Sequence, residues 1–150
     1  MLRGIHPLLG PGLLAALCEI GHGAEIVIAD ANFPASTLGP KVIRADGLAA
    51  EPLLEAILTH MPLDTFEPAA AWHMAMVDTP DVTPPICVSF QEIVARLAGP
   101  FEIAPLERFA FYERAAKAAF IVATGETALF ANLILKKGVV TPQEAAHFPR

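Results

Sequence analysis

The sequence predicts an α/β fold with three layers, α/β/α, in which helices cover both faces of a parallel or mixed central sheet. Short β-branched runs such as residues 25–29 alternate with segments whose apolar residues recur at helical spacing, such as Leu13, Leu14 and Leu17. Strands that are apolar throughout, without polar alternation, are typical of a sheet buried on both faces. The length of 150 residues fits one domain with a sizeable core.

The first half of the chain alternates helices and strands. Pro11 suits the first position of a helix, and Gly21 is a natural terminator. β-branched residues between turn-forming residues indicate the strands, and Pro52 opens a helix that should end before Pro62. The expected elements are a helix at 11–21, strands at 25–29 and 41–45, and a helix at 52–61.

The second half continues the alternation. The proline-rich segment 78–85 predicts an exposed loop after a strand at 70–77. Ser89-Phe90-Gln91-Glu92 matches a capping box, so the next helix is expected to begin at Ser89 and to stop at Gly99-Pro100. The remaining expected elements are strands at 102–106, 120–123 and 132–135, a helix at 109–116 and a turn at 124–126.

Composition argues against several classes of protein. Hydrophobic residues make up 54% of the chain, yet no run reaches the roughly 18 apolar residues of a membrane span, so we expect the apolar surplus at a subunit interface. Prolines and glycines interrupt the apolar segment near the N-terminus, so no signal peptide is expected. The net charge of -6 and scattered basic residues disfavour nucleic acid. Cys18 and Cys87 lie far apart, which favours reduced thiols in the cytosol.

Motifs for metals, nucleotides and acyl transfer are missing from the sequence. The five histidines form no HExxH and no pair at metal-ligand spacing. There is no GxSxG elbow, no GxxxxGK[ST] loop and no GxGxxG after a strand. We therefore expect no metal and no cofactor.

His22 lies between Gly21 and Gly23, where a helix end meets a strand start. Neighbours without side chains let a ligand approach closely, and histidine titrates near neutral pH. His22 is thus a candidate for proton transfer. Glycine pairs mark turns more often than active sites, so these residues alone favour a plain turn.

Asp30 follows the strand at 25–29, and ligands of open α/β sheets gather outside the carboxyl ends of strands. Its carboxylate is a candidate for binding hydroxyl groups of a ligand, and an Asx turn into Asn32 is the alternative. Five extended residues span about 16 Å, which places His22 and Asp30 of one chain at opposite ends of the strand. Either the chain folds back there, or neighbouring subunits complete one site.

Arg108 and Tyr112 lie one helical turn apart, so a helix places a guanidinium beside a phenol ring. They are candidates for clamping a polar ligand. An ordinary solvated charge pattern with Glu113 and Arg114 is the alternative.

Several longer segments, taken in order, carry a family resemblance. They are Gly21-His22-Gly23, residues 30–35 (DANFPA), Gly39-Pro40 with residues 42–47 (VIRADG), residues 108–115 (RFAFYERA), residues 124–126 (TGE) and residues 132–138. In order and spacing they resemble the RbsD/FucU family of sugar pyranases and mutarotases over nearly the whole chain, most closely its L-fucose branch.

This resemblance implies an RbsD-like fold for a domain at residues 1–140, followed by a C-terminal tail at 141–150. It also implies a cytoplasmic homo-oligomer, commonly a decameric ring, with sites at subunit contacts. The implied partner is a monosaccharide. The resemblance implies no cofactor and no binding to nucleic acid or to a membrane.

The resemblance also assigns roles to residues. The proton-donating histidine of the family falls on His22, and its sugar-contacting carboxylate falls on Asp30. The family triplet Tyr-Gly-Asn or Tyr-Ala-Asn falls on Phe130-Ala131-Asn132, where Phe130 can stack on a sugar but lacks the phenolic hydroxyl. The other implied sugar contacts are Arg108 from the fucose branch, and Asp64 and Tyr112 from the animal members.

The implied activity is interconversion of the α and β anomers of a free monosaccharide, L-fucose in the first place. Opening and closing a hemiacetal requires only proton transfers, which one histidine can perform in turn. One alternative is a D-ribose pyranase, to which Ala131-Asn132 is slightly similar. Another is a non-catalytic sugar-binding or transport accessory protein, because Phe130 lacks the hydroxyl.

Overall fold

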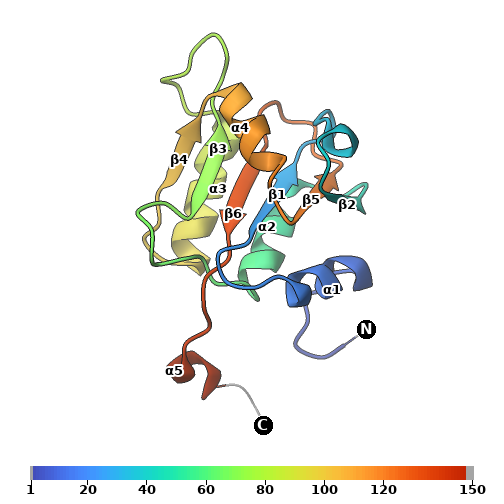
Figure 1. The fold of residues 1–150 in the computed structure, drawn as a ribbon, viewed down its shortest axis with the longest axis vertical. Helices are drawn as coiled ribbons and strands as arrows, with labels where there is room; N and C mark the ends of the chain where they lie inside the picture. Colours follow the sequence, from blue (N-terminus) through green and yellow to red (C-terminus); the bar gives the residue numbers. More distant parts are fainter. Residues whose placement is uncertain (1, 148–150) are drawn as a thin grey trace.

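One six-stranded sheet forms the centre of the computed structural model, which describes residues 2–147 (Figure 1). The strands lie in the order β2-β5-β1-β6-β3-β4. Their bounds are β1 Glu25–Ala29, β2 Lys41–Ala45, β3 Ala71–Met74, β4 Ile103–Leu106, β5 Phe120–Thr124 and β6 Leu133–Lys136.

The sheet is mixed because β6 runs against both of its neighbours. β1 and β2 pair in parallel with β5, and β3 pairs in parallel with β4, whereas β6 is antiparallel to β1 and β3. Glu25 at the start of β1 therefore lies opposite Lys136 at the end of β6. This places the loop before β1 beside the segment that follows β6.

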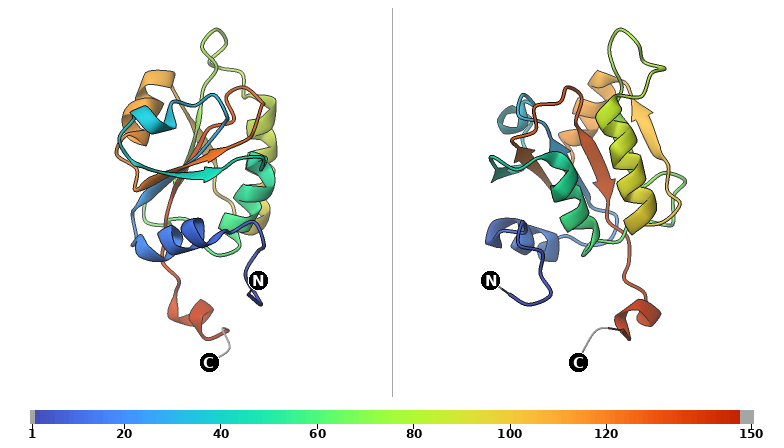
Figure 2. Two further views of the ribbon diagram at one scale, coloured as in Figure 1. Left: turned by 90° about the vertical axis from the view of Figure 1, so that its right-hand side faces the viewer. Right: turned by 180° about the vertical axis from the view of Figure 1, so that it is seen from behind.

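Helices cover both faces of the sheet, which confirms the predicted three-layer α/β/α fold (Figure 2). Ile26 and Ile28 of β1 belong to the apolar cluster that includes the first three helices, while Val27 and Ala29 belong to the cluster on the face of α4. The bounds are α1 Pro11–Glu19, α2 Ala50–Leu58, α3 Pro85–Leu97, α4 Arg108–Ala115 and α5 Pro142–Ala145, with a 3-10 turn η1 at Ala35–Thr37.

The prediction that the third helix begins at Ser89 is wrong. The helix begins at Pro85, directly after Pro84, and Ser89 lies inside it. Proline has the φ of a helix and lacks only an N–H that the first turn leaves unpaired, so Pro85 starts the helix before the capping-box residues are reached. The other expected helices and strands lie at their predicted places, with ends shifted by a few residues.

The C-terminal tail carries α5, which lies away from the three layers (Figure 1). Thr141 and Glu144 close its first turn with reciprocal side-chain-to-backbone hydrogen bonds. Residues 148–150 of the expected tail lie outside the described part of the chain. Within residues 2–147, no helix is long and apolar enough to cross a membrane.

Candidate active site

His22 lies in the loop that joins α1 to β1. The ammonium group of Lys137 donates hydrogen bonds to the carbonyl oxygens of Leu17 (2.9 Å) and Ile20 (2.7 Å), which the end of α1 leaves without helical partners. The Gly23 N–H donates to the carbonyl of Lys137 (2.8 Å), and Gly23 has a φ of 81°. These contacts fix the loop against the end of β6 while 47% of the His22 side chain stays exposed.

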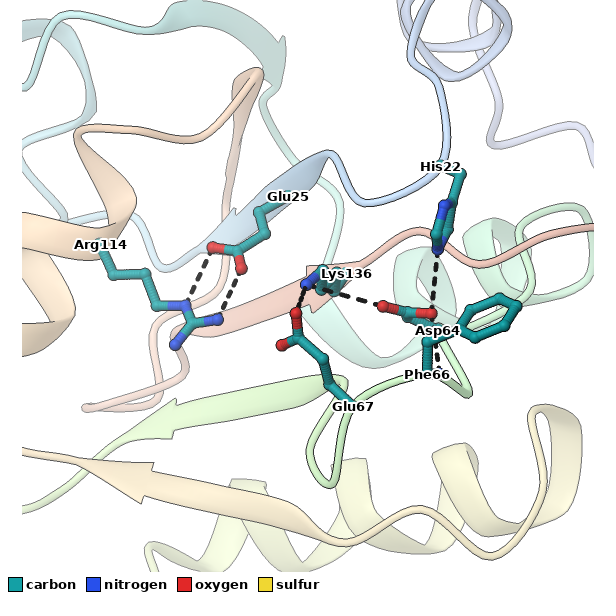
Figure 3. A network of polar contacts seen from close by, with 7 residues as sticks. All are labelled: His22, Glu25, Asp64, Phe66, Glu67, Arg114 and Lys136. Atoms are coloured by element: carbon teal, nitrogen blue, oxygen red, sulfur yellow. Dashed lines mark hydrogen bonds and ion pairs between the residues drawn. The ribbon is translucent and has the colours of Figure 1, made fainter.

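Asp64 lies directly against the His22 imidazole (Figure 3). Its Oδ1 is 3.1 Å from His22 Nε2 and accepts a second hydrogen bond from the Phe66 N–H, also at 3.1 Å. Lys136 Nζ lies 3.6 Å from Oδ2, and the Asp64 side chain is only 2% exposed. The hydrogen bond from the Phe66 N–H holds the pKa of Asp64 below its usual range, and His22 and Lys136 make smaller contributions in the same direction. Asp64 is therefore ionised at neutral pH.

The segment before Asp64 is held against the end of β6. The Asp64 N–H donates to the Lys136 carbonyl (3.1 Å), and the Gly138 N–H donates to the Pro62 carbonyl (2.8 Å). A Cβ atom on Gly138 would lie 2.2 Å from the carbonyl oxygen of Leu63. Only glycine allows this close approach, which brings Asp64 under His22.

A network of charged side chains extends from Asp64 along the same end of the sheet (Figure 3). Lys136 also pairs with Glu67. The hydrogen bond to this carboxylate is the largest contribution that raises the pKa of Lys136. Glu25 accepts two hydrogen bonds from Arg114, at 2.9 and 2.6 Å. The Arg114 guanidinium in turn lies 3.4 Å from the centre of the Trp72 ring. Arg114 thus ties α4 to the start of β1.

Asp30 and Asn132 form a buried pair beyond the opposite end of β1. Asn132 Nδ2 donates to Asp30 Oδ2 (2.6 Å), and the Asp30 N–H donates to Asn132 Oδ1 (3.0 Å). The Asn32 N–H donates to Asp30 Oδ1 (2.9 Å), so the Asx turn considered from the sequence is present. One lone pair on each carboxylate oxygen remains for a ligand.

Phe130, two residues before Asn132, has a strained backbone. Its φ of 61° is the only positive value at a non-glycine position within residues 2–147. The left-handed conformation costs a residue with a Cβ about 1–2 kcal/mol, and such strain clusters at functional sites. The Phe130 ring is half-buried, whereas Ala131 is fully buried and packs in the apolar core rather than facing a ligand.

Arg108 and Tyr112 lie on α4, whose first turn is capped by the Glu107 carboxylate through the Phe109 N–H (2.8 Å). The Arg108 guanidinium packs 4.7 Å from the centre of the Phe109 ring and lines an open pocket of about 390 Å³. Its buried Nε atom has no hydrogen-bond partner among residues 2–147. The Tyr112 ring lies 5.6 Å from that of Phe33, in the turn that follows Asp30.

The structure thus brings the candidate residues together at two places. We call His22 and Asp64 the acid–base half-site, and Asp30, Phe130 and Asn132 the carboxylate half-site. β1 pairs with β5 from Ile26 to Ala29, so the chain does not fold back between them. An extended strand of this length separates the half-sites by about 16 Å.

Sequence reasoning missed the residues that support His22. Lys136, Lys137 and Gly138 follow one another at the end of the last strand, but only the antiparallel direction of β6 brings them to the loop before β1. No three His, Cys, Asp or Glu side chains of the described chain gather in a way that could hold a metal ion.

Several known proteins resemble this chain in both sequence and fold. The chain is 49% identical to fucose mutarotase of Bos taurus over 96% of its own length and 97% of that protein, and 50% identical to fucose mutarotase of Homo sapiens over 93% and 94%. The crystal structure of the Streptococcus pneumoniae fucose mutarotase in complex with L-fucose superposes with a TM-score of 0.86 and 43% identity, covering 93% of this chain and all of that one. The sequence profile of the RbsD / FucU transport protein family matches residues 3–140. The chain therefore belongs to the RbsD / FucU family.

Proposed function

We propose that the protein is an isomerase, a mutarotase that interconverts the α and β anomers of a free monosaccharide, with L-fucose as its substrate. The observation that carries this proposal is an exposed imidazole, His22, held by a buried and ionised carboxylate, Asp64. The fucose mutarotases that resemble the chain across nearly its whole length support the choice of sugar.

His22 supplies the proton transfers that this reaction needs. Ring opening breaks the bond between the anomeric carbon and the ring oxygen, which takes up a proton, while the anomeric hydroxyl loses one and becomes a carbonyl. Both oxygens are attached to the same carbon, so one imidazole nitrogen can accept the first proton and deliver it to the second oxygen. Closure on the other face of the carbonyl reverses these steps and gives the other anomer. Only protons move, so the proposal includes no cofactor.

The carboxylate half-site and α4 bind the sugar in this proposal. Asp30 and Asn132 are fixed by their mutual hydrogen bonds, and such preorganised polar groups orient sugar hydroxyls at little entropic cost. Phe130 offers an apolar face, Arg108 lines an open pocket and its Nε lacks a hydrogen-bond partner in the described part of the chain, and Tyr112 presents a phenol.

Two subunits complete each active site. His22 and Asp30 of one chain lie beyond opposite ends of β1, about 16 Å apart, which is too far for one monosaccharide to bridge within one chain. A head-to-tail contact that places the His22 end of one subunit against the Asp30 end of the next solves this, and repeated contacts of this type form a ring when the rotation between subunits closes. Exposed Phe66 at one end and exposed Leu129 at the other are apolar side chains suited to such a contact. We propose a homo-oligomeric ring, a decamer, located in the cytoplasm.

NMR magnetisation exchange between α and β anomers tests the activity. L-fucose, D-ribose and D-galactose are each measured with the wild-type protein, with His22→Gln and with His147→Gln, a matched control on the exposed tail. We expect the fastest exchange with L-fucose, a loss of roughly 10²-fold or more in His22→Gln and no change in the control.

The alternatives give different results in the same experiment. Pyranose–furanose exchange confined to D-ribose identifies a ribose pyranase. Tight sugar binding without accelerated exchange identifies a binding protein, the role that the missing hydroxyl of Phe130 favours.

A further inference from the structure

We propose that Glu126 is a positioning residue, which fixes the carboxylate half-site by tying the loop between β5 and β6 to the first turn of α2. This inference rests on the proposed mutarotase function. It concerns how tightly the sugar is held, whereas the transfer of protons belongs to His22. The family resemblance includes residues 124–126 but implies no role in the site for Glu126.

The main chain of Glu126 lies beside the turn that contains Asp30. The Ala31 N–H donates to the Glu126 carbonyl (2.9 Å). The Glu126 N–H donates to the Thr124 hydroxyl (3.1 Å), which donates in turn to the Ala29 carbonyl (2.8 Å) at the end of β1. The backbone positions of Asp30 and Glu126 are therefore set together.

The side chain of Glu126 accepts hydrogen bonds from two segments. Its Oε1 accepts from the N–H groups of Thr127 and Ala128, both at 2.8 Å, which closes the beginning of the loop. Its Oε2 accepts from the Ala50 N–H (3.2 Å), in the first turn of α2. The N-cap residue of α2, Ala49, provides no side-chain cap, so a carboxylate distant in sequence pairs one of the N–H groups that this helix end leaves free.

A close crossing of two backbones lets the Glu126 carboxylate reach α2. The Gly125 N–H donates to the Leu48 carbonyl (2.9 Å), and a Cβ atom on Gly125 would lie 2.7 Å from the backbone nitrogen of Gly47. Only glycine allows this approach. The loop and the segment before α2 are thus in direct contact at the position next to Glu126.

The same loop carries the sugar-binding residues. Its far end is held by the hydrogen bonds between Asn132 and Asp30, and Phe130 lies between the two anchors with its φ of 61°. A strained residue keeps such a conformation only where the surrounding structure holds it in place. Glu126 supplies the anchor on the side of β5, and without it Phe130 and Asn132 have to be ordered when the sugar binds.

The contacts of Glu126 require a carboxylate. All three side-chain partners are N–H donors, and the hydrogen bond from Ala128 makes the largest contribution that lowers the pKa of Glu126. The NH₂ group of a glutamine cannot accept a hydrogen bond. Glutamine at this position therefore loses the link to Ala50 when it keeps the two bonds within the loop, and alanine loses all three.

Kinetics of Glu126→Gln and Glu126→Ala test the inference. NMR magnetisation exchange at increasing L-fucose concentration gives kcat and KM, and circular dichroism checks folding. We expect KM to rise by about 3- to 10-fold in Glu126→Gln and by more than about 10-fold in Glu126→Ala, with kcat changed by less than about 3-fold. Binding lost equally from ground state and transition state raises KM alone.

Glu51→Gln is the matched control. Glu51 is a half-buried carboxylate in the same first turn of α2, and it lines a groove with Glu55 and Ser89. Its removal takes the same charge from the same helix end, so stability changes while KM stays within about 2-fold of the wild type. An equal rise of KM in Glu51→Gln would assign the effect to α2 and overturn the inference.

An unchanged KM in Glu126→Ala, or a lower kcat at unchanged KM, would also overturn the inference. A wild-type protein that does not accelerate anomer exchange would instead overturn the proposed function, so the two failures are distinguishable. If neither variant folds, hydrogen–deuterium exchange of the wild type without sugar decides. Peptides that span residues 125–131 should exchange more slowly than unstructured chain, and exchange at the unstructured rate would overturn the inference.

Discussion

Replacing Gly138 with alanine tests how tightly the segment that carries Asp64 is packed against β6. The new Cβ would lie 2.2 Å from the carbonyl oxygen of Leu63 and 3.0 Å from the backbone nitrogen of Asp64. Non-bonded heavy atoms are relaxed at about 3.5 Å, so the segment has to move by roughly 1 Å. The φ of Gly138 is not positive, so the effect is purely steric.

The expected loss of stability follows from this movement. Overpacking of this kind costs about 1–3 kcal/mol. The shift also weakens two backbone hydrogen bonds, from Gly138 to Pro62 (2.8 Å) and from Asp64 to Lys136 (3.1 Å), each worth about 1 kcal/mol. We therefore expect a loss of about 3 kcal/mol, which lowers the melting temperature of a domain of this size by about 6–12 °C. Anomer exchange should slow as well, because Asp64 moves away from His22.

Thermal unfolding followed by circular dichroism measures this effect at one fixed protomer concentration, since the melting temperature of an oligomer depends on it. Gly12→Ala in α1 is the matched control, because its Cβ would meet no atom within 4 Å. That control should be stabilised by up to about 1 kcal/mol through helix propensity. A Gly138→Ala protein that melts within about 2 °C of the wild type would refute the close packing of this segment.

Three further predictions follow from other contacts. Arg114→Lys should lose about 1–2 kcal/mol in chemical denaturation, because lysine replaces neither the two hydrogen bonds to Glu25 nor the stacking on Trp72, and equal stability would contradict this. The folded pKa of Asp64 is below the unfolded value of about 3.9, so its stabilising effect is complete above that pH and is lost on acidification through the folded pKa. The free energy of unfolding of the wild type should therefore fall more between about pH 5 and about pH 3 than that of Asp64→Asn. Parallel plots of unfolding free energy against pH for the two proteins would contradict this prediction. Burial raises the pKa of the Cys87 thiol to about 12, so a Cys18→Ser protein should react with iodoacetamide at pH 8 only after unfolding, and labelling of the native state would show that Cys87 is accessible.

Much of the fold could be predicted because the signals are local. The strands at Glu25–Ala29 and Lys41–Ala45 have the predicted bounds, since each is an apolar or β-branched run ended by turn-forming residues. The start of α3 was missed because two local signals competed, and the proline at position 85 acts before the capping box at Ser89. The direction of β6 has no local signal, and it decides which residues lie beside His22.

The sequence names candidate site residues one by one but does not give their arrangement. The family resemblance named His22, Asp30 and Asn132, yet only the structure shows Asp30 and Asn132 paired across 102 positions of sequence. The contact between His22 and Asp64 spans 42 positions and depends on Gly138 at the end of β6. Spacing in sequence carries no information on such contacts.

The central claim is that each active site takes His22 from one subunit and Asp30 from its neighbour. The most direct test mixes two inactive variants, His22→Gln and Asp30→Asn, by unfolding and refolding them together in equal amounts, and measures anomer exchange of L-fucose by NMR. Random assembly of head-to-tail contacts restores about one quarter of the sites, so we expect about one quarter of the wild-type rate in the mixture and almost none in either variant refolded alone. A mixed assembly that contains both variants and remains as inactive as each variant alone would contradict the shared site.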